Sequence, residues 1–201
     1  VGEEKRAIIM FHGWQGNKDS FKPISKLLKL ENTTWFFPEA PYSCNNQSKK
    51  TWTYEKSPGI WEIEEPKAMI KKFILDKVLS KFNAKDVCIM GFSQGAAICY
   101  ELILSFDIPF GGIFPIGGFI RDYPNHPDKV KIDISPMQKD TPILIGHGKD
   151  DDIVSVEASK KAYQLLKKKC NNVTLHLYSG KHKISLSYLN KVKELILTKD
   201  K

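Results

Sequence analysis

The sequence predicts an α/β domain with a mostly parallel central sheet and helices on both faces. Short apolar runs recur along the chain, and such runs are typical of strands buried on both faces of a parallel sheet. Amphipathic stretches of helical period lie between them. The length of 201 residues suits a single domain over residues 1–201. The expected strands are 6–11, 33–37, 87–90, 111–116, 141–146 and 172–178.

Helix signals fall between these runs. Asp19 or Ser20 is expected to cap a helix whose apolar positions include Phe21 and Leu28. The acids and proline at 64–66 are typical of a helix start, and the apolar stripe that follows predicts a helix to about Phe82. The other expected helices run to about residue 104 after the third strand, and over 155–169 and 185–197.

Composition limits the class of protein. With 41% hydrophobic residues the chain can bury a substantial core. Its four cysteines show no tight spacing and no Cys/His cluster is present, so we expect free thiols, a cytoplasmic protein, and neither a metal nor a cofactor. No apolar run approaches the length of a membrane span, and residues 1–7 do not resemble a signal peptide.

The net charge of +8 raises nucleic acid or an anionic membrane as partners. Only Arg6 and Arg121 are arginines, and lysine lacks the planar fork that suits bases and phosphates. The lysines also lie among acids on helix faces and in loops. We therefore expect a solvated surface with no nucleic-acid partner and at most weak peripheral contact with a membrane. The oligomeric state is left open.

The central feature of the sequence is Gly91-Phe92-Ser93-Gln94-Gly95, a G-x-S-x-G pattern between an apolar run and a helical stretch. In a sharp strand-to-helix turn, the middle residue has a strained backbone and a side chain exposed above the sheet. The serine oxygen then lies at the N-terminus of a helix, where free N–H groups favour negative charge. Ser93 is therefore the expected nucleophile.

The strand at 6–11 runs directly into His12-Gly13-Trp14. A strand followed by His-Gly and a polar turn can bring a backbone N–H towards a nucleophile. Trp14 would offer one such donor to an oxyanion hole, and Gln94 the other. The alternative is an ordinary loop between a strand and a helix.

An acid and a base are expected at later strand ends. Asp150, Asp151 and Asp152 follow the fifth strand, and chemistry alone does not choose among them, although the ligand spacing of an EF-hand is absent. Of the five histidines, His182 lies in a loop just after the last strand, where its ring can reach the nucleophile. His12 and His147 stand beside glycines at strand ends, where a ring is more suited to bracing a loop.

The segment from Tyr42 to Ile60 reads as a long surface loop that carries Trp52 and leads to Trp61. These aromatic rings either wall a substrate pocket or fasten the loop to the core. In the first case an apolar groove would be lined by Trp14, Trp52, Trp61, Phe119 and Ile153.

The motifs FHG (11–13), FPEAP (37–41), GFSQGAA (91–97), HGKDDDIV (147–154) and YSGKH (178–182) resemble the phospholipase/carboxylesterase family, which includes the acyl-protein thioesterases. The resemblance implies an α/β-hydrolase fold with little or no cap domain. It selects Asp151 and His182 as partners of Ser93, with the Trp14 and Gln94 amides as oxyanion donors. Gln15 departs from the family pattern, which usually has glycine there, and a single residue separates Gly180 from His182.

The resemblance and the motifs together imply a serine hydrolase that cleaves carboxylic esters or thioesters through an acyl-Ser93 intermediate. The expected substrate is an acylated protein, as for an acyl-protein thioesterase, and the alternatives are a small ester or a lysophospholipid. A second class of function is a non-catalytic binding protein on a hydrolase fold. Such proteins usually lose a triad member, whereas Ser93, Asp151 and His182 are all present.

Overall fold

The computed structural model describes residues 4–45, 47–121 and 132–198. Its centre is a six-stranded sheet with the order β10-β9-β8-β7-β1-β2, and every neighbouring pair of strands is parallel. The expectation of a mostly parallel sheet is thus confirmed. The strands are β1 (Arg6–Phe11), β2 (Thr33–Phe36), β7 (Val87–Phe92), β8 (Gly112–Ile116), β9 (Ile143–Gly148) and β10 (Val173–Tyr178).

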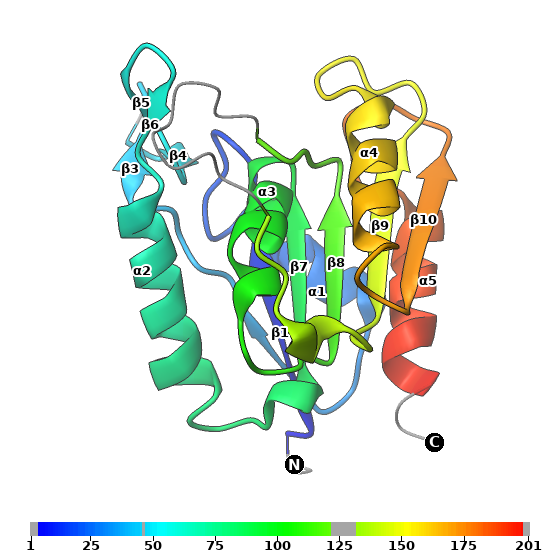
Figure 1. Ribbon diagram of the computed structural model, residues 1–201. Helices are drawn as coiled ribbons and strands as arrows, with labels where there is room; N and C mark the ends of the chain where they lie inside the picture. Colours follow the sequence, from blue (N-terminus) through cyan, green and yellow to red (C-terminus); the bar gives the residue numbers. More distant parts are fainter. Residues whose placement is uncertain (1–3, 46, 122–131, 199–201) are drawn as a thin grey trace.

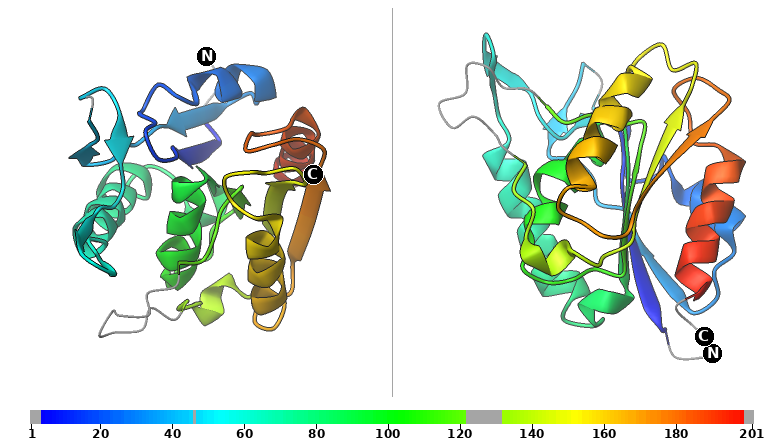
Figure 2. Two further views of the ribbon diagram at one scale, coloured as in Figure 1. Left: turned by 90° about the horizontal axis from the view of Figure 1, so that it is seen from above. Right: turned by 45° about the vertical axis from the view of Figure 1, so that its right-hand side comes forward.

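Helices cover both faces of the sheet (Figures 1 and 2). Two of them, α1 and α5, lie together on one face, and α2, α3 and α4 lie on the other. The carboxyl ends of all six strands meet at one edge, which is uppermost in Figure 1. The helices are α1 (Lys22–Leu28), α2 (Glu64–Phe73), α3 (Gln94–Glu101), α4 (Val156–Leu166) and α5 (Leu186–Leu197).

Alternation along β1 divides the apolar residues into two cores. Ala7 and Ile9 pack beneath α2, α3 and α4, whereas Ile8 and Met10 pack against α1 and α5. All four side chains are fully buried or nearly so. Successive strand residues point to opposite faces, so a strand covered on both sides must be apolar throughout. This explains why the strands appear in the sequence as unbroken apolar runs.

Two helices differ from the expectation. Neither Asp19 nor Ser20 caps α1, because the Asn17 side chain accepts the Asp19 N–H (2.9 Å) and the Ser20 hydroxyl accepts the Asn17 N–H (2.9 Å). These residues form a separate turn, and α1 begins at Lys22 after an N-cap without a side-chain hydrogen bond. The helix expected from 64 to 82 ends its α-helical part at Phe73 and continues as π-helix over Ile74–Val78.

The segment expected to be a plain loop contains two small antiparallel hairpins. They consist of β3 (Tyr42–Ser43) with β4 (Lys50–Thr51), and β5 (Glu55–Ser57) with β6 (Ile60–Trp61). Both hairpins lie near the carboxyl edge of the sheet (Figure 1). Within the described residues, no helix is both long and apolar enough to cross a membrane.

The C-cap of α1 provides a test of backbone energetics. Lys29 has left-handed backbone angles (φ 45°, ψ 54°), which cost about 1–2 kcal/mol for a residue with a Cβ atom. Lys29 is exposed, so replacement by glycine removes no packing. We expect Lys29→Gly to raise the free energy of unfolding by about 0.5–1 kcal/mol, measured by urea denaturation.

The matched control is Lys26→Gly, an exposed position inside the same helix. There glycine is expected to lower the free energy of unfolding by about 1 kcal/mol. If both substitutions raised, or both lowered, the free energy of unfolding, the backbone angles of Lys29 would not explain the effect.

Candidate active site

Ser93 lies between β7 and α3 at the carboxyl edge of the sheet. Its φ of 54° is left-handed, and its backbone N–H donates to the Ile116 carbonyl of β8 at 2.8 Å. A Cβ atom at Gly91 would collide with the backbone of Gly95, and one at Gly95 with the backbone of Phe11. The two glycines therefore allow the close approach of β1, β7 and α3 that holds the serine in its strained conformation.

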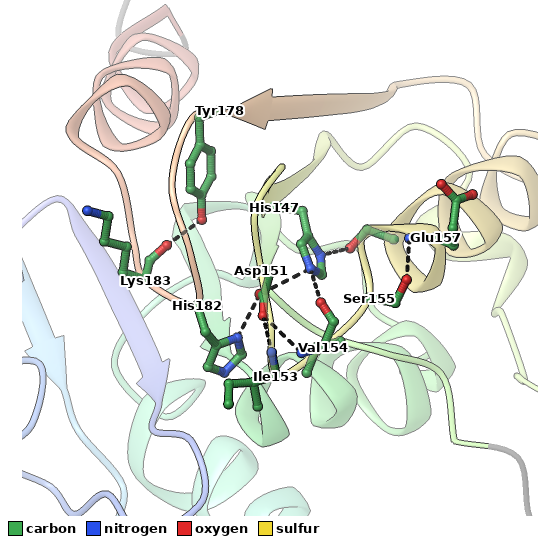
Figure 3. Close-up of polar contacts among 10 residues, drawn as sticks. His147, Asp151, Ile153, Val154, Ser155, Glu157, Tyr178, His182 and Lys183 are labelled. Atoms are coloured by element: carbon green, nitrogen blue, oxygen red, sulfur yellow. Dashed lines mark hydrogen bonds and ion pairs between the residues drawn. The ribbon is translucent and has the colours of Figure 1, made fainter.

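His182 lies in the loop after β10, and its ring stacks at a tilt on Phe92, with ring centroids 4.7 Å apart. Gly117 lies beside the ring and has a left-handed backbone (φ 55°), a conformation that favours glycine. The loop is fixed by the Tyr178 hydroxyl, which donates to the Lys183 carbonyl at 2.6 Å (Figure 3). His182 is thus placed beside the residue that precedes Ser93.

In the described part of the chain, the Ser93 hydroxyl makes no hydrogen bond to His182 or to any other protein group. Hydrogen bonds between nucleophile and base are often long in enzymes without substrate and shorten in the reacting complex. The geometry brings the two side chains to the same edge without closing this bond.

Asp151 accepts three hydrogen bonds and has a second histidine nitrogen in contact with it. Its Oδ2 atom lies 2.7 Å from Nδ1 of His182 and 3.2 Å from Nε2 of His147, and its Oδ1 atom accepts the N–H groups of Ile153 (3.0 Å) and Val154 (2.9 Å). Figure 3 shows the carboxylate between the two rings. Burial raises the pKa of Asp151. The hydrogen bonds from His182 and the two backbone amides together lower the pKa by more than burial raises it, so the pKa lies below its ordinary value.

The three consecutive aspartates have three different partners in the loop that carries His182. Asp150 accepts the Gly180 N–H at 3.2 Å, Asp151 pairs with His182, and Asp152 forms an ion pair with Lys181 at 2.8 Å. Among the three, Asp151 alone has its side chain almost fully buried against a histidine. Asp151 therefore differs from its two neighbours in both burial and hydrogen-bonding partner.

Trp14 and Gln94 offer backbone N–H groups next to Ser93. Neither N–H donates to a protein acceptor within the described residues. The Gln94 side chain is held by the 42–60 segment, because its Oε1 atom accepts the Trp52 N–H at 2.9 Å and its amide nitrogen donates to Thr51 at 2.9 Å. A Cβ atom at Gly13 would lie 3.2 Å from Cβ of Ser93, so the loop that carries Trp14 passes close to the serine.

His12 and His147 brace loops, as their positions in the sequence indicate. The Nε2 atom of His12 accepts the Ala40 N–H at 3.1 Å, and its Nδ1 atom, therefore protonated, donates to the Gly13 carbonyl at 2.8 Å. Burial lowers the pKa of His12 and so favours the neutral ring. The ring links the turn of Trp14 to the loop that follows β2.

A cavity of about 590 Å³ opens at Ser93. Of the residues predicted to line a groove, Trp14, Trp61, Phe119 and Ile153 lie on it. Trp14 is 64% exposed and Ile153 is 72% exposed, which is unusual for large apolar side chains. Residues on the wall that the sequence did not reveal are Thr51, Thr53, Ile120, Arg121 and Val154.

The prediction for Trp52 is wrong. It was predicted as a substrate-binding residue, but its side chain is fully buried and it does not line this cavity. Its ring packs edge-on against Phe11 at 5.5 Å, and its indole N–H donates to the His12 carbonyl at 2.8 Å. Trp52 therefore fastens the 42–60 segment to the core, which was the alternative for these aromatic residues.

The described residues contain no group of three or more His, Cys, Asp or Glu side chains that could hold a metal ion. What they bring together is a serine on a strained turn, a histidine–aspartate pair and an apolar cavity. Such a combination of residues is suited to nucleophilic catalysis by a serine beside an apolar binding cavity.

Solved structures share this architecture. The structure of SOBER1 from Arabidopsis thaliana superposes with a TM-score of 0.77 at 26% identity, covering 98% of this chain and all of that one. The esterase PE8 gives a TM-score of 0.80 at 22% identity, covering 98% and 94%. The fold is therefore that of the α/β-hydrolases, with helices on both faces of a parallel sheet.

The phospholipase/carboxylesterase family matches residues 2–199, and the chain belongs to this family. Among characterised relatives, it is 27% identical to carboxylesterase SOBER1 of Arabidopsis thaliana over 94% of this chain and 88% of that protein. It is 24% identical to acyl-protein thioesterase 1 of Kluyveromyces lactis over 82% of this chain and 77% of that protein.

The lowered pKa of Asp151 makes stability depend on pH. The folded state binds this proton more weakly than the unfolded chain, so the carboxylate stabilises the fold above the unfolded pKa of about 3.9, and this contribution is lost as the pH falls through the folded value. We expect the free energy of unfolding of the wild type to fall more steeply below pH 4 than that of Asp151→Asn, measured by urea denaturation from pH 3 to pH 7.

Asp152→Asn is the control, since hydrogen bonding from Lys181 also lowers the pKa of Asp152 but the pair is exposed. Its effect should be small and should disappear in high salt. If the free energy of unfolding depended on pH in the same way for the wild type and Asp151→Asn, the lowered pKa would not belong to Asp151.

Proposed function

We propose that the protein hydrolyses carboxylic esters or thioesters through an acyl-Ser93 intermediate. The observation that carries the proposal is the 2.7 Å bond between His182 and the buried Asp151, beside a serine held on a strained strand-to-helix turn. Membership of the phospholipase/carboxylesterase family supports the same reaction class. The alternative function, that of a non-catalytic binding protein, does not require a hydrogen-bonded His182–Asp151 pair near the serine.

In the first half of the reaction, Ser93 Oγ attacks the carbonyl carbon and its proton passes to Nε2 of His182. Asp151 accepts a hydrogen bond from Nδ1–H of His182, which fixes the tautomer and stabilises the imidazolium. The carbonyl oxygen becomes an oxyanion and would accept the N–H groups of Trp14 and Gln94. Both of these N–H groups are free of protein acceptors in the described chain.

The tetrahedral intermediate then breaks its bond to the leaving group, which takes the proton from His182 and departs as an alcohol or thiol. Water attacks the acyl-serine, with His182 again removing a proton, and the second collapse returns that proton to Ser93. The products are a carboxylic acid and the alcohol or thiol. No redox step and no group beyond water is required.

The walls of the cavity favour an acyl chain as the group bound beside Ser93. Trp14, Trp61, Phe119 and Ile153 present a largely apolar surface, and burying a chain there removes apolar area from water. Two relatives are named acyl-protein thioesterase 1 and carboxylesterase SOBER1. We infer that acylated protein is the principal substrate and that small carboxylic esters are the alternative.

A covalent probe tests the nucleophile. We expect an alkyl fluorophosphonate to label Ser93, located by peptide mass spectrometry, and expect the labelling to be lost in Ser93→Ala and reduced at least hundredfold in His182→Ala. Turnover of a p-nitrophenyl ester should fall by about 10³–10⁴ in Asp151→Asn, which offers the wrong hydrogen-bonding partner to Nδ1.

Asp150→Asn and Asp152→Asn are matched controls, because each neighbouring carboxylate contacts the same loop but not His182. Both should retain turnover within a few-fold of the wild type. A folded wild type that resists labelling would favour the binding-protein alternative.

Chain length tests the cavity. Ile153 is largely exposed on the cavity rim, so Ile153→Ala should leave the fold intact. We expect kcat/KM for decanoyl esters to fall about three- to tenfold while that for acetyl esters stays unchanged, because only the longer chain reaches this side chain.

Leu27→Ala removes a comparably exposed residue from α1, away from the cavity, and should affect neither substrate. An equal loss on acetyl and decanoyl esters in Ile153→Ala would count against acyl binding at this wall.

A further inference from the structure

A second histidine contacts the carboxylate of Asp151. His147 is the penultimate residue of strand β9, and its ring is fully buried. Its Nε2 atom lies 3.2 Å from Asp151 Oδ2 and 2.8 Å from the Val154 carbonyl oxygen, and its Nδ1 atom lies 2.6 Å from the Ser159 hydroxyl (Figure 3).

These partners fix where the proton of the His147 ring lies. A carbonyl oxygen accepts but cannot donate, so Nε2 must carry the proton that faces Val154. A neutral ring then has a bare Nδ1, which accepts the hydroxyl proton of Ser159. The Nε2–H group therefore donates to the Val154 carbonyl, and Asp151 Oδ2 lies 3.2 Å from the same nitrogen.

The same carboxylate oxygen thus accepts the N–H of His182 and lies close to the ring nitrogen of a second histidine, His147. His182 approaches from the cavity side with its ring partly exposed, and His147 approaches from the protein interior. The two backbone N–H groups of Ile153 and Val154 hold the other oxygen. Contacts on both oxygens favour one orientation of the carboxylate, the one that faces His182.

We propose that His147 is a positioning residue for the reaction, which holds the Asp151 carboxylate against His182 and draws off part of its negative charge. The inference rests on the proposed function, since it assigns a role within the same triad. His147 does not itself line the substrate cavity; it contacts Asp151 directly and also binds the Val154 carbonyl, and the N–H of Val154 holds the other carboxylate oxygen.

The direction of the effect on His182 follows from the charge. The Nε2–H group is the positive end of a bond dipole and lies 3.2 Å from Asp151 Oδ2, so it makes the carboxylate a weaker partner for protonated His182. Without it, Asp151 would stabilise the imidazolium more strongly. The other ionisable groups around the pair are Asp152, whose charge also interacts with His182, and Tyr178, which faces Asp151. Both stay in place when His147 is changed.

The test removes the donor without leaving a buried hydroxyl unpaired. His147→Leu combined with Ser159→Ala deletes both members of the buried bond, and His147→Gln keeps an amide N–H near the position of Nε2. Active sites are counted by fluorophosphonate labelling, and kcat, KM and the pH profile of kcat/KM are measured on a p-nitrophenyl ester per labelled site.

We expect the Leu/Ala variant to lose ten- to hundredfold in kcat at nearly constant KM, with the acidic limb of the profile about half a pH unit higher. His147→Gln should recover most of kcat. His176→Leu, a histidine in β10 that contacts Ser187 rather than the triad, should match the wild type.

A Leu/Ala variant with wild-type kcat per labelled site and an unshifted profile would overturn the proposal. So would a loss of kcat in both His147 variants without any shift of the profile, which would indicate general loosening of the loop. A wild type that does not label at Ser93 would overturn the proposed function itself, a result that is distinct from either of these.

Discussion

The parallel alignment of the six strands is the constraint on which the rest of the molecule depends. Because every strand runs in the same direction, the loops after β1, β7, β9 and β10 all emerge at one edge. These loops carry Trp14, Ser93, Asp151 and His182, which come from four separate parts of the chain. The hydrophobic burial that aligns the strands therefore also assembles the polar site, with no element dedicated to that purpose.

Local interactions then refine what the sheet brings together. The Ser93 turn is held by a backbone hydrogen bond to β8, and the His182 loop is fixed to the Asp150–Asp152 loop by three separate pairs. Like charges on adjacent residues would repel one another, but each of these aspartates has its own donor, so the repulsion is offset locally. The outer two pairs fasten the loops together, and the buried central one orients the imidazole.

The sequence predicted the strands well because residues buried on both faces must be apolar, and that leaves an unmistakable run of letters. The positions of Ser93 and His182 just after two parallel strands, β7 and β10, were predictable from the apolar runs that precede them. Trp52 was misassigned because the sequence does not distinguish an aromatic residue that faces a cavity from one that packs into the core when both lie in a polar segment. The start of α1 was misplaced because Asp19 and Ser20 serve a local turn that competes with capping. The contact from His147 to Asp151 spans a turn whose shape no periodicity reveals.

The buried Trp52 has a consequence for how the molecule opens. Its indole N–H is bound to the His12 carbonyl and its backbone N–H to the Gln94 side chain, so one residue of the 42–60 segment touches both stretches that flank the serine. A transient opening that pulls out this ring exposes a large apolar surface and frees both stretches together. The segment and the serine turn should therefore exchange their amide hydrogens as one cooperative unit. The arrangement of loops around Ser93 then persists only while the indole ring of Trp52 stays buried in the core.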